Sequence, residues 1–287
     1  MTVYLEGVHF DLLYATPREV AFKCVAATLS DLASHGAKPR YVNVQASLRQ
    51  EANEHLIMEI ETGVAEASKF FKVKAEFSLG SMSPSNHLLQ VLATGQAKSK
   101  GALAPQAGDV IAVTGPLGAA AAALQCLRQL GRGSLVENEK LANAYLKPAC
   151  RIHEAHFLAD KKLASAVDLQ DGLAAELNAL LAQHDLGALL HEKSIPVSPL
   201  AAEGARILGM TSERWGLYGA EDFELLFICS PRNWTAIEKG LKKHNCRPVP
   251  IGQVKPASAG VKIETTSGQI TGLPARLWHP LVRRRRA

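Results

Sequence analysis

The chain has 287 residues, of which 47% are hydrophobic and 21% are charged, a composition that excludes a disordered or low-complexity protein. Four units of the net charge of +5 belong to Arg283–Arg286, and the remaining +1 does not suggest that the body of the protein binds nucleic acid. The tail itself could bind nucleic acid or an acidic partner, or it could be a solvated chain end. The sequence shows no apolar run of about 18 residues and no signal peptide, so we expect a cytoplasmic protein without membrane contacts.

Residues 6–10, EGVHF, are the first notable segment, because acidic, aromatic and imidazole side chains gather around a glycine close to the start of the chain. Chain ends usually fray, so such a cluster is unusual there unless its residues belong to a site.

The next segment predicts a helix. Thr16 can cap it, Pro17 suits its first turn, Glu19 completes a capping box and Gly36 ends it. Asp31 lies near the C-terminal end, where the helix dipole disfavours a carboxylate. This position indicates either a compensating cation or an exposed aspartate with a small penalty.

Strands and helices then alternate. Residues 41–48 predict a half-buried strand, residues 54–72 a helix, and residues 75–97 two strands around a loop of small residues. Such alternation is typical of an α/β or α+β layer fold. Residues 102–109, rich in Ala, Gly and Pro, indicate a linker.

Residues 110–127 predict a strand, a Gly/Pro turn and a helix. A glycine turn before a helix can hold phosphate on its exposed amides, or it can simply pack tightly. Later in the chain, a glycine turn carries Glu221 and Asp222 into an apolar strand. We expect the remaining elements to be a helix near 233–243 and strands over 249–254 and 260–265.

Another turn between a strand and a helix carries two carboxylates. We expect a short strand over Ala166–Leu169 and a helix that Gly187 ends, with Asp168 and Asp171 on either side of the turn. Asp171 is explained equally well as the N-cap of the helix, but Asp168 at a strand end is not. Two carboxylates three residues apart at such a turn can hold a hard divalent cation.

In this order, these segments resemble the thiamine-monophosphate kinase family, in the superfamily of aminoimidazole ribonucleotide synthetase. The resemblance rests on EGVHF, LSDLASHGAKP, GSMSPS, VTGPLG, VDLQDGL and YGAEDFEL. In that family a further segment with a metal-binding Gly-Asp-Asp motif precedes EGVHF. The resemblance therefore implies that a preceding element is missing from this sequence, which would explain why a site-like segment opens it.

The resemblance implies ATP-dependent transfer of the γ-phosphoryl group to thiamine monophosphate, with Mg²⁺ and ATP as cofactors. Phosphate attacking phosphate brings negative charges together, and Mg²⁺ held by carboxylates neutralises them. The acceptor is already an oxyanion, so positioning and charge neutralisation can supply most of the catalysis.

The resemblance also assigns roles to individual residues. The expected Mg²⁺ ligands are Asp31, Asp168 and Asp171, and the last two are also the expected catalytic residues. The expected substrate-binding residues are His9, Glu221 and Trp278, of which the last is explained equally well by ordinary packing. The expected nucleotide-binding residues are Gly80, Ser81 and Gln170.

The sequence departs from the family pattern on the nucleotide and metal side. The replaced positions are Thr2 and Ser81 for metal-binding aspartates, Gln170 for a serine, and Ala102 for an arginine that Lys98 or Lys100 could substitute. Each lost carboxylate removes an anionic oxygen from Mg²⁺·ATP. Three readings stay open: an active thiamine-monophosphate kinase, a related phosphotransferase or ligase-type enzyme on another small substrate, and an inactive homologue that binds a ligand.

The resemblance implies two domains and a homodimer. We expect residues 1–105 to form a sheet with helices on one face, and two such sheets from two chains to close a dimeric β-barrel. We expect residues 106–287, which end in the basic tail 283–287, to form an α/β sandwich. The site would lie between the two domains and bind a small phosphorylated molecule.

Overall fold

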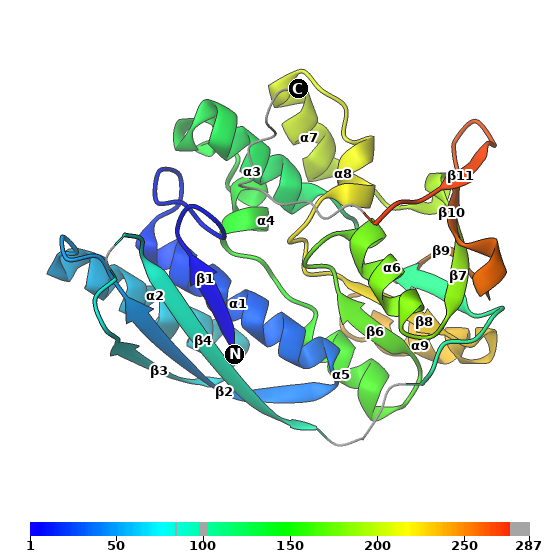
Figure 1. Ribbon diagram of the computed structural model, residues 1–287, viewed down its shortest axis with the longest axis horizontal. Coiled ribbons are helices and arrows are strands. Elements are labelled where there is room, and N and C mark those ends of the chain that lie inside the picture. The colour runs from blue at the N-terminus through cyan, green and yellow to red at the C-terminus, as the bar shows by residue number, and fades with distance from the viewer. Residues whose placement is uncertain (84, 98–102, 276–287) are drawn as a thin grey trace.

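The computed structural model describes residues 1–83, 85–97 and 103–275, which form two mixed sheets and the helices that cover them (Figure 1). The first part of the chain builds a four-stranded sheet with two long helices, and the rest builds a seven-stranded sheet with helices on both faces. The expected mixed α/β class is therefore confirmed.

The first sheet has the strand order β1-β4-β2-β3, with β2 and β3 parallel and the other neighbours antiparallel. Its strands are β1 (Thr2–Leu5), β2 (Ala37–Ser47), β3 (Lys74–Leu79) and β4 (Leu88–Ala97), and the helices on one face are α1 (Pro17–Ser34) and α2 (Glu54–Phe71). On β2, Val42 and Val44 are buried under the helices, whereas Asn43 between them points to the opposite face. The described strands close no barrel.

The second sheet has the order β11-β10-β7-β9-β5-β8-β6 and is antiparallel except between β10 and β7. Its central strands are apolar on both faces, as expected for a sheet covered on both sides. Its strands are β5 (Val110–Val113), β6 (Ser165–Asp168), β7 (Leu186–His191), β8 (Leu225–Cys229), β9 (Val249–Pro256), β10 (Val261–Glu264) and β11 (Ile270–Gly272).

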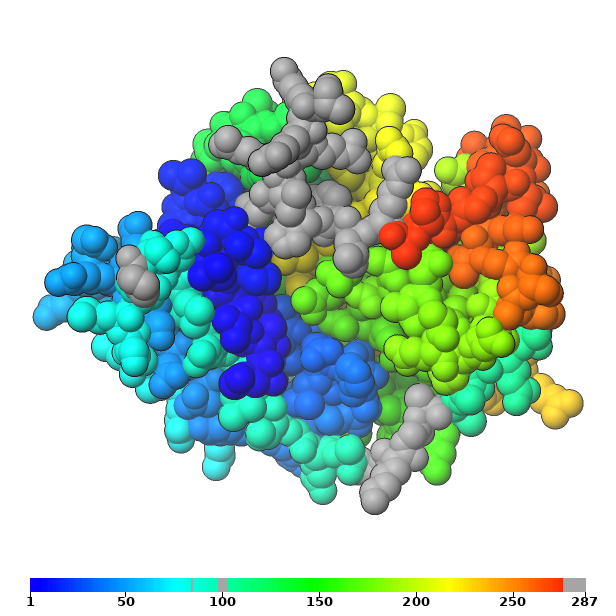
Figure 2. Space-filling model, viewed as in Figure 1, coloured from blue at the N-terminus to red at the C-terminus, as the bar shows by residue number. Residues whose placement is uncertain are grey.

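Helices cover both faces of the second sheet and also join it to the first. Leu177 of α6 packs with Ile111 on one face, and Leu158 of α5 packs with Phe227 on the other. Three further helices share an apolar cluster with α1, so the two halves have a common core, and Figure 2 shows them packed directly together. These three are α3 (Ala119–Leu130), α4 (Glu139–Leu146) and α7 (Pro199–Leu208). The remaining helices are α5 (Ile152–Asp160), α6 (Leu173–Ala182), α8 (Glu213–Tyr218) and α9 (Trp234–Lys242).

Most of the expected elements are present, but one boundary is wrong. The capping box of α1 forms as expected, since the Thr16 hydroxyl accepts from the Glu19 amide and the Glu19 carboxylate accepts from the Thr16 amide. Gly187 does not end a helix, because α6 ends at Ala182 and Gly187 lies inside β7. A Cβ at this position would lie 2.6 Å from the carbonyl oxygen of Gly260, so close backbone packing explains the glycine.

Helix α1 is the element on which the two halves meet. It is buried along nearly its whole length, because the first sheet and α2 pack on one side and α4, α5 and β6 on another. Although α1 and α2 each have 18 residues, neither of them, nor any other helix in the described part of the chain, is apolar enough to cross a bilayer. Glu19, Lys23 and Ser30 share one side of α1, and each buried polar group there needs a partner.

Glu19 finds its partner in Arg132, which follows α3. The guanidinium donates to the two carboxylate oxygens at 2.6 and 2.7 Å, and it donates also to the carbonyl oxygen of Tyr14 at 3.2 Å. Burial alone would raise the pKa of Glu19, but the hydrogen bonds from Arg132 and Thr16 outweigh it and lower the pKa. This pair ties the start of α1 to the second half of the chain.

Replacing Arg132 with Ala should lower the free energy of unfolding by about 1–3 kcal/mol, because the buried Glu19 carboxylate loses its two charged donors. Arg18 pairs with Glu59 nearer the surface, and R18A should cost less than about 1 kcal/mol. Urea unfolding of the two variants measures both losses. Equal losses would contradict the anchoring role of the Glu19–Arg132 pair.

Candidate functional site

The three carboxylates expected to bind Mg²⁺ come from two elements that meet. Asp31 lies in the last turn of α1, and Asp168 is the last residue of β6, which packs against α1. Asp171 follows in the turn before α6. Asp31 and Asp168 lie close enough for their charges to interact, so the structure brings them to one place.

Asp168 is the most deeply buried of these three carboxylates. Only 6% of the residue is exposed, and its Oδ2 atom has no hydrogen-bond partner among the described residues. Burial, followed by repulsion from Asp31, raises the pKa of Asp168 to about 6, while the Ser30 hydroxyl opposes this shift. A buried carboxylate oxygen without a partner is costly, and a bound cation would account for it.

The reading of Asp171 as the N-cap of α6 is wrong. The capping position is Gly172, with φ 94°, and no side chain at that position bonds the first turn. The Asp171 amide instead donates to Oε1 of Glu176 at 3.1 Å. Burial is the main cause that raises the pKa of Glu176 to about 7, and nearby carboxylates including Asp168 add to it. Glu176 is therefore a further carboxylate near Asp168 and Asp171, and the sequence analysis did not identify it.

Asp31 is the most easily explained of the group. Its side chain is 53% exposed, and Nδ1 of His35 lies 3.5 Å from its carboxylate. A protonated His35 would supply the compensating cation that a carboxylate at a helix C-terminus requires. The structural argument for a metal therefore depends on Asp168 more than on Asp31.

Residues 219–224 form a loop that is held to the turn after β6, since the Glu221 amide donates to the carbonyl oxygen of Gln170 at 2.9 Å. Glu221 and Phe223 have φ values of 66° and 50°, which residues other than glycine rarely adopt. Such strain persists only where surrounding contacts hold the backbone in place.

Asp222 supplies one of these contacts. Its carboxylate accepts from the amides of Gly118 and Ala120 at 2.6 and 3.1 Å, so it caps α3, whose own N-cap residue has no side chain. Burial raises the pKa of Asp222 to about 7, and the amides oppose this shift. The hypothesis that the glycine turn before α3 binds phosphate is wrong, because the amides of that turn already donate to the Asp222 carboxylate.

Glu224 supplies another contact. Arg151 donates to its two carboxylate oxygens through Nε and Nη2, at 2.7 and 2.8 Å, and the Thr114 hydroxyl donates at 2.5 Å. A Cβ at Gly115 would lie 2.6 Å from Oε1 of Glu224, which explains the glycine there. Asp222 and Glu224 thus hold the loop in place through these hydrogen bonds.

Glu221 pairs with Lys23, a residue that the sequence analysis missed. Nζ of Lys23 lies 2.8 Å from Oε1 of Glu221 and 3.4 Å from the centre of the Tyr145 ring. The run VAFKCVAA contained a signal, because lysine is almost never buried in a helix unless it is paired. The pair joins α1 to the loop.

His9 lies in the turn after β1, where its Nδ1 accepts from the Leu5 amide at 3.0 Å. Its ring packs edge-on against Tyr4, with 5.8 Å between the ring centres. Burial, with a smaller contribution from the Glu221 carboxylate, raises the pKa of Tyr4. Tyr4 therefore contacts His9 and lies within electrostatic range of Glu221, the two expected substrate-binding residues described here.

The expected nucleotide-binding residues are more dispersed. Gly80 follows the edge strand β3, where its amide donates to the carbonyl oxygen of Ala46 at 2.8 Å, and Ser81 beside it is exposed. Their described contacts are with β2, whereas Gln170 lies directly between Asp168 and Asp171 in the chain. Several residues named in the sequence analysis lie outside the part of the chain that the structure describes. They are Lys98, Lys100, Ala102, Trp278 and Arg283–Arg286.

Within the described ranges, no three His, Cys, Asp or Glu side chains converge as a ready-made metal site. Mg²⁺ commonly takes one or two protein carboxylates and completes its shell with water and substrate phosphates. The unpartnered Asp168 oxygen, whose carboxylate also interacts with the charge of Asp31, fits that use of the ion. The residues therefore suit a hard cation that arrives with a phosphate ligand.

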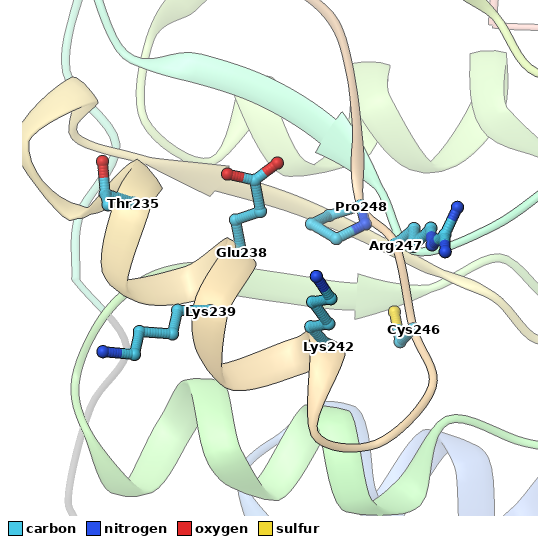
Figure 3. A pocket seen from close by; sticks show the side chains of 7 residues that line it. All are labelled: Thr235, Glu238, Lys239, Lys242, Cys246, Arg247 and Pro248. Atoms are coloured by element: carbon cyan, nitrogen blue, oxygen red, sulfur yellow. The ribbon is translucent and has the colours of Figure 1, made fainter.

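A separate hollow of about 430 Å³ lies beside α9 (Figure 3). Its charged side chains are exposed, and none of the expected site residues lines it. These features are typical of a solvated helix end. The lining residues are Thr235, Glu238, Lys239, Lys242, Cys246, Arg247 and Pro248.

Comparison with known proteins gives matches along most of the chain. Residues 1–95 match the family described as AIR synthase related protein, N-terminal domain, and residues 106–263 match the corresponding C-terminal domain. The thiamine-monophosphate kinase of Buchnera aphidicola subsp. Schizaphis graminum is 31% identical over 271 residues, which cover 90% of this chain and 79% of that protein.

Solved structures share the fold. Thiamine monophosphate kinase from Aquifex aeolicus superposes with a TM-score of 0.80 at 24% identity, covering 94% of this chain and 87% of that chain. A structure described as AaThiL complexed with AMPPCP and TMP gives a TM-score of 0.80 at 23% identity, with coverages of 97% and 85%.

Replacing Asp168 with Asn should stabilise the ligand-free protein at neutral pH. The carboxyl titrates near pH 3.8 when unfolded and near 6 when folded, so the folded state binds this proton more tightly. Wild-type stability therefore falls as the pH rises from about 4 to about 6, and the loss persists above that range. D168N lacks this titration and should be more stable by about 1–3 kcal/mol near pH 7.5, with little difference near pH 4.

Thermal unfolding of both proteins across this pH range measures the difference. Addition of MgATP and a phosphorylated acceptor should then raise the Tm of the wild type more than that of D168N. A difference in stability that does not change with pH would contradict the burial of a charged Asp168.

Proposed function

The chain belongs to the thiamine-monophosphate kinase family of AIR synthase related proteins, and from this membership we propose that it phosphorylates thiamine monophosphate with ATP to give thiamine diphosphate. The similarity runs through both halves of the chain and through 79% of a relative that carries this name. A protein of the same fold is complexed with AMPPCP and TMP.

The observation that supports this chemistry in the present chain is the buried, unpartnered oxygen of Asp168 where β6 meets α1. Transfer between two phosphates needs a hard cation held by oxygen ligands, and in this proposal Asp31 and Asp171 would supply further carboxylates to it. A purely structural role of these residues would leave the Asp168 oxygen unexplained.

In the proposed reaction, an oxygen of the acceptor phosphate forms a bond to the γ-phosphorus of ATP, the bond from that phosphorus to the β,γ-bridging oxygen breaks, and ADP leaves. Bound Mg²⁺ would neutralise phosphate oxygens during this transfer. Asp31, Asp168 and Asp171 would hold the ion, and Glu176 would orient the turn by accepting from the Asp171 amide. No general base is required, because the acceptor phosphate is already ionised near neutral pH.

We place the acceptor beside His9 and Glu221 and the nucleotide toward Gln170, Gly80 and Ser81. Ser81 and Thr2 bring no carboxylate to the nucleotide side, so more of the charge neutralisation falls on the acidic group between α1 and α6. This arrangement should bind MgATP with lower affinity than a site that keeps every aspartate of the family pattern.

The purified protein should convert thiamine monophosphate to thiamine diphosphate in the presence of MgATP, and EDTA should abolish the conversion. D171N should lower kcat/KM by at least about 100-fold, because the metal loses an anionic ligand. The matched control is D185N, since Asp185 is exposed and, with φ 53°, has a backbone that asparagine also tolerates. Chromatographic separation of the thiamine phosphates measures all three proteins.

A folded wild type that makes no thiamine diphosphate at millimolar substrates would refute the proposed function. If it consumed ATP with a different phosphorylated acceptor, the related-enzyme reading would replace it. If it bound thiamine monophosphate without any turnover, the inactive-homologue reading would apply.

We further propose that the protein is a homodimer formed through the first sheet, with a domain boundary near residue 105. Among the described strands, β1 and β3 each have one neighbour, so both edges of this sheet are open to pairing. Val3 and Leu92 are exposed on the face opposite α1 and α2. Two copies of residues 1–105 placed face to face would cover these side chains and close a barrel, and residues 106–287 would form the second domain.

Light scattering should give a mass twice that of the 30.8 kDa chain. L92D should shift the mass toward that of one chain, because it buries a carboxylate in the proposed interface. L130D is the matched control, since Leu130 is similarly exposed but lies on α3. A monomeric wild type, or equal effects of both substitutions, would contradict the proposed interface.

A further inference from the structure

Lys23 is a buried ammonium group in the middle of α1. Only 6% of the residue is exposed, and its stem lies among the apolar residues that surround the helix. Nζ lies 2.8 Å from Oε1 of Glu221 and above the Tyr145 ring. Burying an ammonium is costly, so its contacts should normally be complete.

The contacts of this pair are incomplete. The ammonium can donate three hydrogen bonds, yet Nζ makes an ion pair without a well-aligned hydrogen bond in the described residues. Oε2 of Glu221 likewise has no hydrogen-bond partner there. Two buried polar atoms with unused capacity at the junction of the two halves indicate a place where a polar ligand completes the contacts.

Other partly buried charged pairs are complete by comparison. Arg132 holds both carboxylate oxygens of Glu19, and Arg151 holds both carboxylate oxygens of Glu224. Bidentate pairs of this kind fix geometry. The single contact between Lys23 and Glu221 leaves the lysine able to exchange its partner.

The position of Lys23 suits a phosphate. Lys23 and Ser30 are seven residues apart on the same side of α1, a distance of about 10 Å along the helix axis. Ser30 lies beside Asp168, one of the proposed metal ligands, so the side of α1 that carries the ammonium also faces Asp168 on β6. A phosphate between them would meet a cation at one end and a metal ion at the other.

We propose that Lys23 binds the phosphate of the acceptor, and that Glu221 takes the place of this phosphate in the ligand-free protein. The inference rests on the proposed function and adds a substrate-binding residue to it. The Glu221 side chain is 17% exposed and therefore reaches the surface of the junction, where an incoming monophosphate can displace it from Nζ. A phosphate dianion presents more charge and more acceptor oxygens to the ammonium than a carboxylate does. The released Glu221 is then free to contact the rest of the substrate.

The test compares binding of thiamine monophosphate with binding of thiamine, which lacks the phosphate, by isothermal titration calorimetry in the presence of Mg²⁺. For the wild type, the phosphate should strengthen binding. For K23Q, the affinity for thiamine monophosphate should fall by about 10- to 100-fold while the affinity for thiamine stays within about twofold, because only a charge-assisted contact to phosphate is lost. K23R retains the charge and should recover part of the affinity.

The matched control is K147Q. Lys147 also pairs with a glutamate, since its Nζ lies 3.2 Å from Glu66, and it lies over the ring of Phe22. If lysine pairs of this kind only hold the halves together, K23Q and K147Q should have the same small effect on both ligands. K147Q should instead leave both affinities unchanged.

The outcomes separate this inference from the proposed function. A wild type that neither binds nor phosphorylates thiamine monophosphate refutes the proposed function itself. An active wild type whose affinity for thiamine monophosphate is unchanged in K23Q overturns the role of Lys23, and so does a parallel loss of affinity for thiamine. If K23Q does not fold, a crystal structure of the wild type with thiamine monophosphate decides, because Nζ farther than hydrogen-bond distance from the phosphate overturns the inference.

Discussion

A buried helix with polar side chains on one side is the constraint on which this structure depends. Helix α1 packs against the first sheet, but it also carries Glu19, Lys23 and Ser30 on a side that faces the second half of the chain. Leaving a buried charge such as Glu19 or Lys23 without a partner would cost several kcal/mol, so the second half must bring partners to fixed positions along the helix. Arg132 and Glu221 do so for Glu19 and Lys23, and β6 packs against the end of α1 that carries Ser30. The site is thus positioned by the same contacts that join the two halves.

The loop 219–224 shows how one acidic segment serves several purposes. Asp222 caps α3 and Glu224 binds Arg151, and both carboxylates are fully engaged by these partners. Because two neighbours on the chain are fixed, the backbone of Glu221 is held at a positive φ that it would rarely adopt alone. A backbone supported in this way can stay in place when a ligand displaces the Glu221 side chain, as proposed above.

Local sequence signals predicted part of this arrangement, while contacts between distant residues could not be predicted. The capping box of α1 involves residues three apart, so Thr16 and Glu19 defined the start of that helix correctly. The cap of α3 comes from Asp222, 104 residues away from Gly118, and the isolated glycine turn therefore looked like a phosphate site. Gly187 carries the usual signal for a helix end, but it is required by packing inside β7. Asp168 was identified because no local role explained it, and the structure likewise gives one of its oxygens no partner.

Two of the divergent positions lie at the edges of the first sheet, where packing restrains them least. Thr2 is on β1 and Ser81 follows β3, the two edge strands of the first sheet, which are three inter-strand spacings or about 14 Å apart. A substitution at such an edge leaves the core intact, because the side chain is not enclosed by neighbouring strands on both sides. Substitution of Lys23 alone would instead leave a buried charge without its partner. The same physical asymmetry explains how this chain can lack carboxylates on the nucleotide side and still keep the Glu19–Arg132 and Lys23–Glu221 pairs along α1, where the acceptor and the metal ion are proposed to bind.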